Sequence, residues 1–255
     1  MCELFAISST EKINIQKHLE EFFSRGVHHP HGWGLINIDN MSLYREPARS
    51  DTSEKLKLIL SRPFLSKTAL AHIRYATIGD IATDNCHPFV GYSVQGTMIS
   101  LIHNGTLFDG TYTDCYYKLQ KGDTDSERLL MYLIEKINRE EFRKAGKLNT
   151  EEKISVIEEL VLELSKNNKL NLIISDGELL YVHSNFKDTL YYSELEGHTL
   201  IATVPLKEGE WQNVPFRKLN VWKEGRLILT GSRTTHEYIE DKEHTKYLYG
   251  NYSSL

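Results

Sequence analysis

The chain has 255 residues, of which 40% are hydrophobic and 25% are charged, so it has material for one large core or two small ones. Its net charge is −5 and it contains no Lys/Arg block, which argues against a nucleic-acid partner. No apolar run approaches the roughly 20 residues of a membrane span. Only Cys2, Cys86 and Cys115 are cysteines, and no signal peptide precedes them, so we expect a cytoplasmic protein with reduced thiols and no membrane partner.

The amino terminus places a cysteine directly before an apolar run. Residues 2–8 predict a short buried strand, and Ser9 or Thr10 is expected to cap a helix that ends near Ser24. Removal of Met1, which the small Cys side chain permits, would leave a thiol and a free α-amine on Cys2. An α-amine has a pKa of about 7.7–8.0, so it can serve as the base for that thiol. The alternative is that the position of this cysteine has no functional meaning.

A histidine-rich break follows the predicted helix. His28, His29 and His31 could bind a metal, although their spacing matches no closed zinc site. Glycines then flank Trp33, which indicates either a tight turn or backbone that passes close to another group at the start of a strand. We expect a partner strand over 43–47 and a short helix over 53–61.

Two later strands end in polar groups. The strand over 67–76 carries Arg74 near its end, where a guanidinium could bind a carboxylate or form an ordinary surface ion pair. The apolar strand that begins at Met98 runs into Asn104 and Gly105. A side-chain amide beside a glycine N–H is one way to build an oxyanion hole. Asn-Gly is also the strongest two-residue signal for a hairpin turn, so both readings stay open.

The second half of the chain predicts two helices and several strands. Thr124 and Glu127 fit a capping box at the start of a helix that ends near residue 140, and Asp125 is either a helix-end charge or a partner for an ammonium group. Another helix is expected over 150–166, and strands over 170–174, 179–183, 187–194, 199–204, 220–222 and 226–229. We expect one domain over 1–231 and a polar tail over 232–255, packed through tyrosines: Tyr238, Tyr247, Tyr249 and Tyr252.

Six short motifs occur in one order along the chain. They are Met1-Cys2-Glu3-Leu4-Phe5, His31-Gly32-Trp33-Gly34, His72-Ile73-Arg74-Tyr75-Ala76-Thr77, His87-Pro88-Phe89, His103-Asn104-Gly105 and Thr124-Asp125-Ser126-Glu127. Together they resemble the class II glutamine amidotransferases, which are N-terminal-nucleophile hydrolases, and within them the stand-alone branch with the YafJ-type and EgtC-like proteins. The resemblance implies an α+β fold, a four-layer αββα sandwich of two mainly antiparallel sheets between outer helices.

The same resemblance implies a role for each site residue. Cys2 would be the nucleophile, with its own α-amine as base through a water molecule. Asn104 and the N–H of Gly105 would hold the oxyanion, Arg74 would bind the α-carboxylate of glutamine, Asp125 would bind its α-ammonium, and Thr77 would assist at that end. No cofactor and no metal are implied. We expect four histidines at motif positions to fix loops by hydrogen bonding: His31, His72, His87 and His103.

Three functions from different classes follow. The leading one is hydrolysis of the side-chain amide of glutamine to glutamate and ammonia, or of another γ-glutamyl amide as in EgtC-like hydrolases. We see no sugar-phosphate or nucleotide-binding motif in this sequence, so ammonia would pass to a separate synthase subunit or to water. The second is a non-catalytic regulatory subunit that binds a γ-glutamyl ligand. The third is a metal-dependent hydrolase built on His28, His29 and His31.

Overall fold

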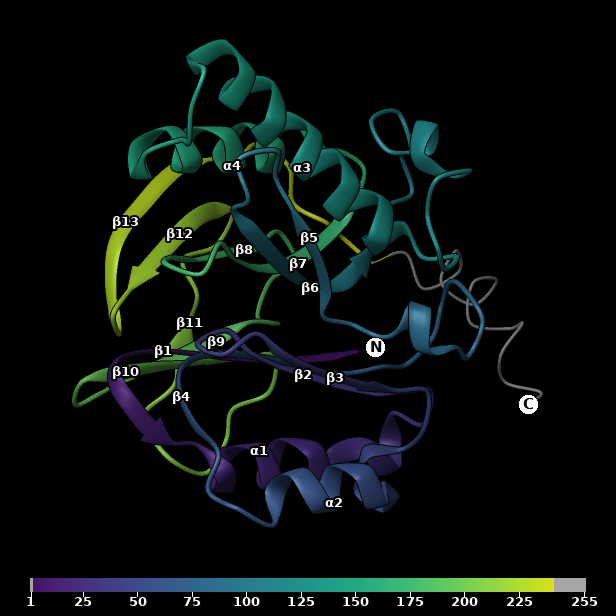
Figure 1. Cartoon of the computed structure of the whole chain (residues 1–255), viewed down its shortest axis with the longest axis vertical. Coiled ribbons are helices and arrows are strands. Elements are labelled where there is room, and N and C mark those ends of the chain that lie inside the picture. The colour runs from purple at the N-terminus through teal and green to yellow at the C-terminus, as the bar shows by residue number, and fades with distance from the viewer. Residues whose placement is uncertain (1, 241–255) are drawn as a thin grey trace.

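Two stacked antiparallel sheets form the centre of the molecule, and two pairs of helices cover their outer faces. The computed structural model describes residues 2–240. In Figure 1, α1 and α2 lie against one sheet, and α3 and α4 lie against the other. This is the α+β, four-layer αββα sandwich that the resemblance implied.

The first sheet has seven strands in the order β11-β9-β10-β1-β4-β2-β3. Its strands are β1 (Glu3–Asn14), β2 (Trp33–Asn37), β3 (Ser42–Glu46), β4 (Leu65–Ile73), β9 (Tyr191–Leu195), β10 (His198–Ala202) and β11 (Gln212–Asn213). Strand β1 is central and pairs with β10 on one side and β4 on the other. The residue that precedes β1, Cys2, therefore lies between the ends of two neighbouring strands.

The second sheet has six strands in the order β13-β12-β8-β7-β6-β5. Its strands are β5 (Phe89–Tyr92), β6 (Met98–Thr106), β7 (Lys169–Ser175), β8 (Leu180–Ser184), β12 (Lys218–Lys223) and β13 (Arg226–Arg233). Apolar side chains from both sheets meet in a shared core that includes Leu4, Ile102 and Trp222. This core holds the start of β1 against β6 and fixes how the two strand ends face each other.

The outer helices each bury one apolar face. They are α1 (Gln16–Phe23), α2 (Glu54–Leu60), α3 (Asp125–Lys144) and α4 (Thr150–Leu164), with short 3-10 turns at Ser24–His28, Ser50–Thr52, Thr83–Asn85 and Asp114–Tyr116. A core that contains Phe5 and Phe22 joins α1 to the first sheet, and a core that contains Leu133 and Leu160 joins α3 and α4 to the second. The helices thus support the sheets from outside and leave the strand ends accessible.

The start of the chain differs from the sequence prediction. The helix expected from Ser9 or Thr10 begins only at Gln16, because β1 continues to Asn14. After a register shift, Ile13 and Asn14 pair with Ser66 and Leu65 at the far end of β4. The sequence prediction was wrong here because the pairing partner, more than 50 residues away, supplies the hydrogen bonds that extend the strand.

Two smaller differences concern a helix cap and the end of the chain. The Thr124 hydroxyl accepts the Glu127 N–H at 3.3 Å as expected, but the Glu127 carboxylate accepts from Lys121 and Gly122, so the reciprocal half of the capping box is absent. Strand β13 is longer than predicted and ends at Arg233. The Tyr238 ring packs against two phenylalanines, Phe108 and Phe186. Tyr247, Tyr249 and Tyr252 lie outside the described residues, and the division of the chain at residue 231 stays a prediction.

Candidate active site

Cys2 lies directly before β1, and its sulfur contacts the backbone of the loop after β4. The Tyr75 N–H points to Sγ at 3.4 Å, and Sγ lies 3.4 Å from the Tyr75 carbonyl oxygen. Burial raises the pKa of the Cys2 thiol; the positive charge of Arg74 lowers it and the Asp125 carboxylate raises it. Both charges are therefore close enough to act on the sulfur. A thiol with a raised pKa is protonated at neutral pH and needs a base to become a nucleophile.

Asn104 and Gly105 lie within β6 and do not form a hairpin turn. They pair with Asn171 and Leu170 of β7. A Cβ atom on residue 105 would lie 2.0 Å from the Lys169 carbonyl oxygen, so only glycine permits this close approach of two strands. The alternative reading of Asn-Gly as a turn is wrong, because the pairing partner lies some 65 residues further along the chain. The Asn104 side chain makes no hydrogen bond to another described residue.

Arg74 is buried and does not form a surface ion pair. Its guanidinium donates to the backbone carbonyl oxygens of Ile78, Gly79 and Asp80 at 2.8–2.9 Å, and only 3% of the residue is exposed. The guanidinium carries five N–H groups, so these bonds leave capacity for a further acceptor. Arg74 thereby fixes the loop that contains Thr77, which is itself half-buried.

Asp125 is the first residue of α3 and is 4% exposed. Its Oδ2 accepts the Leu107 N–H at 2.7 Å, so the helix end is tied to the segment that follows β6. Ser126 Oγ lies 2.9 Å from His103 Nδ1 and 3.4 Å from Asp125 Oδ1. The Lys169 carbonyl, 3.2 Å from His103 Nε2, can only accept, so Nε2 carries the proton and the Ser126 hydroxyl donates to Nδ1. The sequence did not single out Ser126 as a partner of His103.

The four motif histidines divide into two groups. His31 Nδ1 accepts the Ala76 N–H at 2.8 Å, so His31 holds the loop after β4, and His103 holds the start of α3. Those two confirm the expected loop-fixing role. His72 and His87 stack with ring centroids 4.2 Å apart, and their buried ring nitrogens have no hydrogen-bond partner within residues 2–240. Burial places the pKa of both well below the ordinary value, so they are neutral packing groups, and the expectation for them was wrong.

The three histidines considered as metal ligands, His28, His29 and His31, do not share a common contact. His29 Nδ1 contacts the Arg25 carbonyl at 3.1 Å, and its Nε2 lies 3.8 Å from Glu3. His31 is engaged with the loop after β4, and His28 is exposed. In the part of the chain that the structure describes, no three His, Cys, Asp or Glu side chains are arranged to hold a metal ion.

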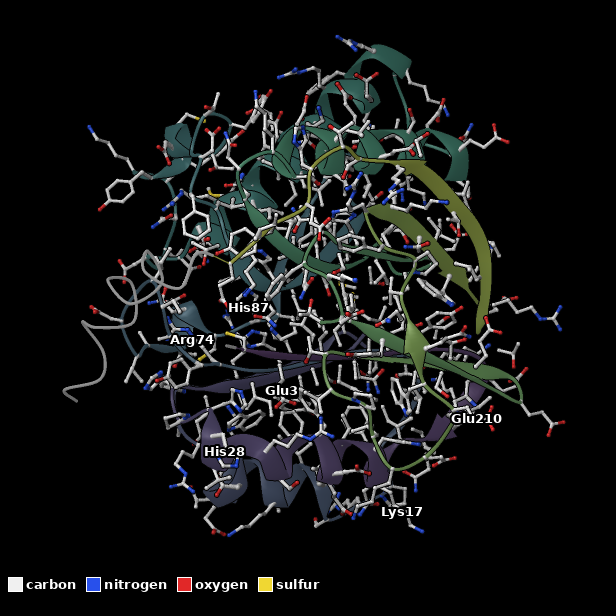
Figure 2. The ribbon with its side chains drawn as sticks, turned by 180° about the vertical axis from the view of Figure 1, so that it is seen from behind. Glu3, Lys17, His28, Arg74, His87 and Glu210 are labelled. Atoms are coloured by element: carbon white, nitrogen blue, oxygen red, sulfur yellow. The ribbon has the colours of Figure 1, made fainter. Side chains whose placement is uncertain are left out.

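Cys2 and Asn104 line one pocket of about 380 Å³. Its other walls come from the start of β1, the turn before β2, the β8–β9 connection and the segment after β10: Glu3, His29, Asp188, Thr189, Tyr191, Thr203, Val204 and Pro205. Four predicted site residues, Arg74, Thr77, Gly105 and Asp125, are not on these walls. Figure 2 shows Glu3, Arg74 and His87 on the same side of the molecule, with Glu3 nearer the layer of α1 and α2.

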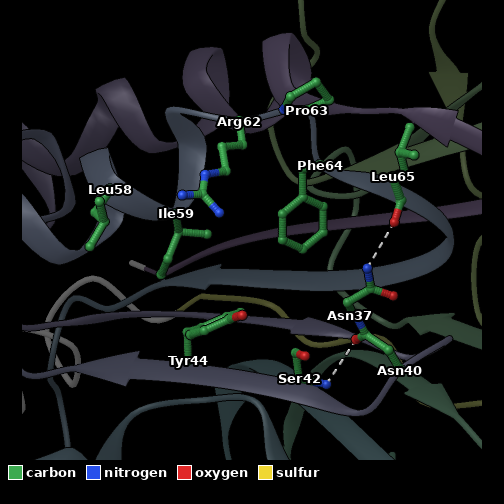
Figure 3. Close-up of a pocket in the computed structure, with 10 residues that line it drawn as sticks. All are labelled: Asn37, Asn40, Ser42, Tyr44, Leu58, Ile59, Arg62, Pro63, Phe64 and Leu65. Carbon is green, nitrogen blue, oxygen red and sulfur yellow. Dashed lines mark hydrogen bonds between the residues drawn. The ribbon is translucent and has the colours of Figure 1, made fainter.

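A larger hollow of about 510 Å³ lies elsewhere, between β3 and α2 (Figure 3). Tyr44, Arg62 and Phe64 are among its walls, and the Asn37 amide donates to the Leu65 carbonyl at 2.9 Å. Its walls carry no cysteine, histidine or carboxylate. This hollow offers the hydroxyls of Ser42 and Tyr44 but no base beside them to activate either one.

Comparison with known proteins agrees with this fold. The family model described as "Glutamine amidotransferases class-II" matches residues 1–196. This is well over half of the chain, and the protein belongs to that family. The fold is shared with the solved glutamine phosphoribosylpyrophosphate amidotransferase from B. subtilis, which superposes with a TM-score of 0.65 at 16% identity, over 92% of this chain and 50% of that one. Within residues 2–240, no helix combines the length and the apolar character needed to cross a bilayer.

Relatives exist among archaea and bacteria. "Uncharacterized protein MJ1515" of Methanocaldococcus jannaschii is 27% identical over 266 residues, which covers 92% of this chain and 73% of that protein. "Putative glutamine amidotransferase YafJ" of Escherichia coli K12 is 28% identical over 188 residues and 72% of each chain. A crystal structure titled as a predicted glutamine amidotransferase from Pseudomonas aeruginosa PA01 superposes with a TM-score of 0.62 at 22% identity, over 89% of this chain and 100% of that one.

Proposed function

We propose that the protein is a cysteine amidohydrolase that cleaves the side-chain amide of glutamine and releases glutamate and ammonia. The observation that supports this most directly is that the Cys2 thiol and the Asn104 amide line the same pocket. A nucleophile and an unpaired amide donor in one pocket are two of the parts that acyl transfer requires; the third is a base.

The reaction would begin at Cys2 once Met1 has been removed. The α-amine takes the thiol proton through a water molecule, which compensates for the raised pKa of the thiol. Sγ then attacks the amide carbon, and the Asn104 side chain with the Gly105 N–H stabilises the oxyanion. The carbon–nitrogen bond breaks, the nitrogen leaves with the proton as ammonia, and water hydrolyses the thioester to glutamate.

The charges beside the thiol would hold the amino-acid end of the substrate. Arg74 would bind the α-carboxylate through the guanidinium N–H groups that its own loop does not use. Asp125 would accept from the α-ammonium with Oδ1, since Oδ2 is engaged with the Leu107 N–H. Thr77 lies in the loop that Arg74 fixes and would contact the same end. We propose that ammonia then passes to water or to a separate synthase subunit.

The test is turnover by the processed protein and by cysteine variants. We expect glutamate and ammonia in equal amounts from the wild-type chain and none from Cys2→Ala. Cys115→Ser is the matched control because Cys115 is exposed and lies outside the pocket, so its activity should stay at the wild-type level. Binding of glutamine without turnover in the processed wild-type chain would instead favour the regulatory-subunit alternative.

A further inference from the structure

Lys169 is a buried lysine on the face of the second sheet that carries the Asn104 side chain. In the pairing of β6 with β7, Thr106 lies opposite Lys169 and Asn104 lies opposite Asn171. Side chains two residues apart on a strand point to the same face, so Lys169 and Asn104 are diagonal neighbours on one face. Only 5% of Lys169 is exposed. It therefore lies one residue pair beyond the proposed oxyanion donor.

This face of the sheet is directed toward the start of β1. Ile102, the preceding residue of β6 on this face, and Leu4 of β1 belong to the core that both sheets share. Cys2 lies two residues before Leu4, on the same side of β1, and lines a pocket with Asn104. From the core outward, this face thus presents first Ile102, then Asn104 beside the thiol, and then Lys169.

The ammonium group of Lys169 lies among two aromatic rings and a carboxylate. Its Nζ lies 4.1 Å from the centre of the Phe186 ring, 5.5 Å from that of Tyr238 and 3.9 Å from Glu240 Oε1. Burial lowers the pKa of Lys169 to about 8, and the negative charges of Glu240 and of a Cys2 thiolate oppose this shift. The ammonium is therefore present at neutral pH, and it is close enough to Cys2 for the two charges to interact.

We propose that the Lys169 ammonium stabilises the negative charge that forms at the reaction centre, first on the Cys2 sulfur and then on the oxyanion beside Asn104. The inference deepens the proposed function, on which it rests, by adding a charged residue to the reaction. Of the charges around the thiol, Arg74 acts in the same direction and Asp125 opposes it. Lys169 keeps its proton throughout, and the α-amine still takes the proton of the thiol. A cation that is already in place when the anion forms lowers the barrier without further reorganisation.

The test is the pH profile of Cys2 alkylation by iodoacetamide in the processed protein, with the adduct mapped by mass. Unit charges roughly 7–10 Å apart shift each other's pKa by about one unit at the effective dielectric constant of a protein. At neutral pH, Lys169→Met should therefore react about tenfold more slowly than the wild type. The difference should shrink as the pH rises above about 8, where Lys169 of the wild type loses its proton. Circular dichroism checks folding, and Lys169→Gln replaces Lys169→Met if that variant does not fold.

A charge-retaining variant and a matched control complete the set. Lys169→Arg should react within about twofold of the wild type at neutral pH. One unit above the pKa of Lys169 it should react about twofold faster or more, because arginine keeps its proton there. Lys136 of α3 is also a buried lysine, with Glu163 at 3.0 Å and the Tyr132 ring at 5.5 Å, but it lies in the outer helix layer. Lys136→Met should leave the profile of Cys2 unchanged.

The outcomes separate this inference from the proposed function. Equal rates of wild type and Lys169→Met at neutral pH, or a Lys169→Arg variant as slow as Lys169→Met, would overturn the inference, because packing alone does not follow the charge. The value of kcat/KM for glutamine at neutral pH should fall about tenfold in Lys169→Met and stay within about twofold in Lys169→Arg. Absence of turnover in every chain, together with a lysine-dependent alkylation profile, would remove the proposed function and leave the effect on the thiolate standing.

Discussion

Replacement of Asn104 by alanine should separate catalysis from stability. Asn104 is only 6% exposed, yet its side chain makes no hydrogen bond to another described residue, so its removal leaves no buried partner unsatisfied. We expect the free energy of unfolding to change by less than about 1 kcal/mol. Loss of one oxyanion donor, by contrast, commonly costs about 2.7–4 kcal/mol of transition-state stabilisation, or 10²–10³-fold in kcat.

Its cross-strand neighbour provides the matched control. Asn171 is fully buried, donates to Thr189 at 2.8 Å and accepts from Ser184 at 2.6 Å. Asn171→Ala should therefore destabilise the fold by about 1–3 kcal/mol and change kcat by less than tenfold. The assays are steady-state glutamate release and urea unfolding on the same preparations. If Asn104→Ala keeps kcat within about threefold of the wild type, or changes only KM, the oxyanion assignment is wrong.

Three further predictions concern substrate binding, pH and stability. Asp125→Asn keeps an acceptor for the Leu107 N–H but removes the negative charge. The value of kcat/KM for glutamine should therefore fall about 10–100-fold, mainly because KM rises. An unchanged KM would contradict the proposed contact with the α-ammonium group. Because burial raises the pKa of the Cys2 thiol, iodoacetamide alkylation of Cys2 should accelerate only at a pH above the range of free cysteine. A profile that coincides with that of free cysteine would contradict this. The Asp176 carboxylate lies 2.6 Å from Lys153 Nζ, and the Asp176 side chain is 1% exposed. Asp176→Ala should therefore lower the free energy of unfolding in urea by about 3–5 kcal/mol and leave kcat unchanged. A decrease of less than about 1 kcal/mol would refute this prediction.

The sequence predicted the individual helices and strands of the fold better than their ends, and the four layers followed only from the family resemblance. Most strands and both long helices follow from apolar periodicity, which depends on neighbours only a few residues away. The extension of β1 to Asn14 could not be predicted in that way, because its hydrogen bonds come from Leu65 and Ser66. The position of Asn104 and Gly105 within a strand could not be predicted for the same reason. The local sequence favours a turn, but pairing with the distant strand β7 keeps both residues in β6.

The sequence likewise predicted some features of the candidate site and not others. The motif order predicted that Cys2 and Asn104 belong together, and they share a pocket. The pocket walls from Asp188 and Val204 carry no motif, so only the fold could reveal them. The hydrogen bonds from Arg74 to three carbonyl oxygens of its own loop could not be predicted from the sequence either, because every residue type has a backbone carbonyl.

The most direct test of a working Cys2 nucleophile is intact mass before and after incubation with 6-diazo-5-oxo-norleucine, a glutamine analogue that alkylates a thiolate held in a glutamine site. We predict a chain that has lost Met1 and gains one adduct, which maps to Cys2 and is absent from Cys2→Ala. A processed chain that hydrolyses no γ-glutamyl amide and gains no adduct, or gains it at Cys86 or Cys115, would contradict the assignment of Cys2.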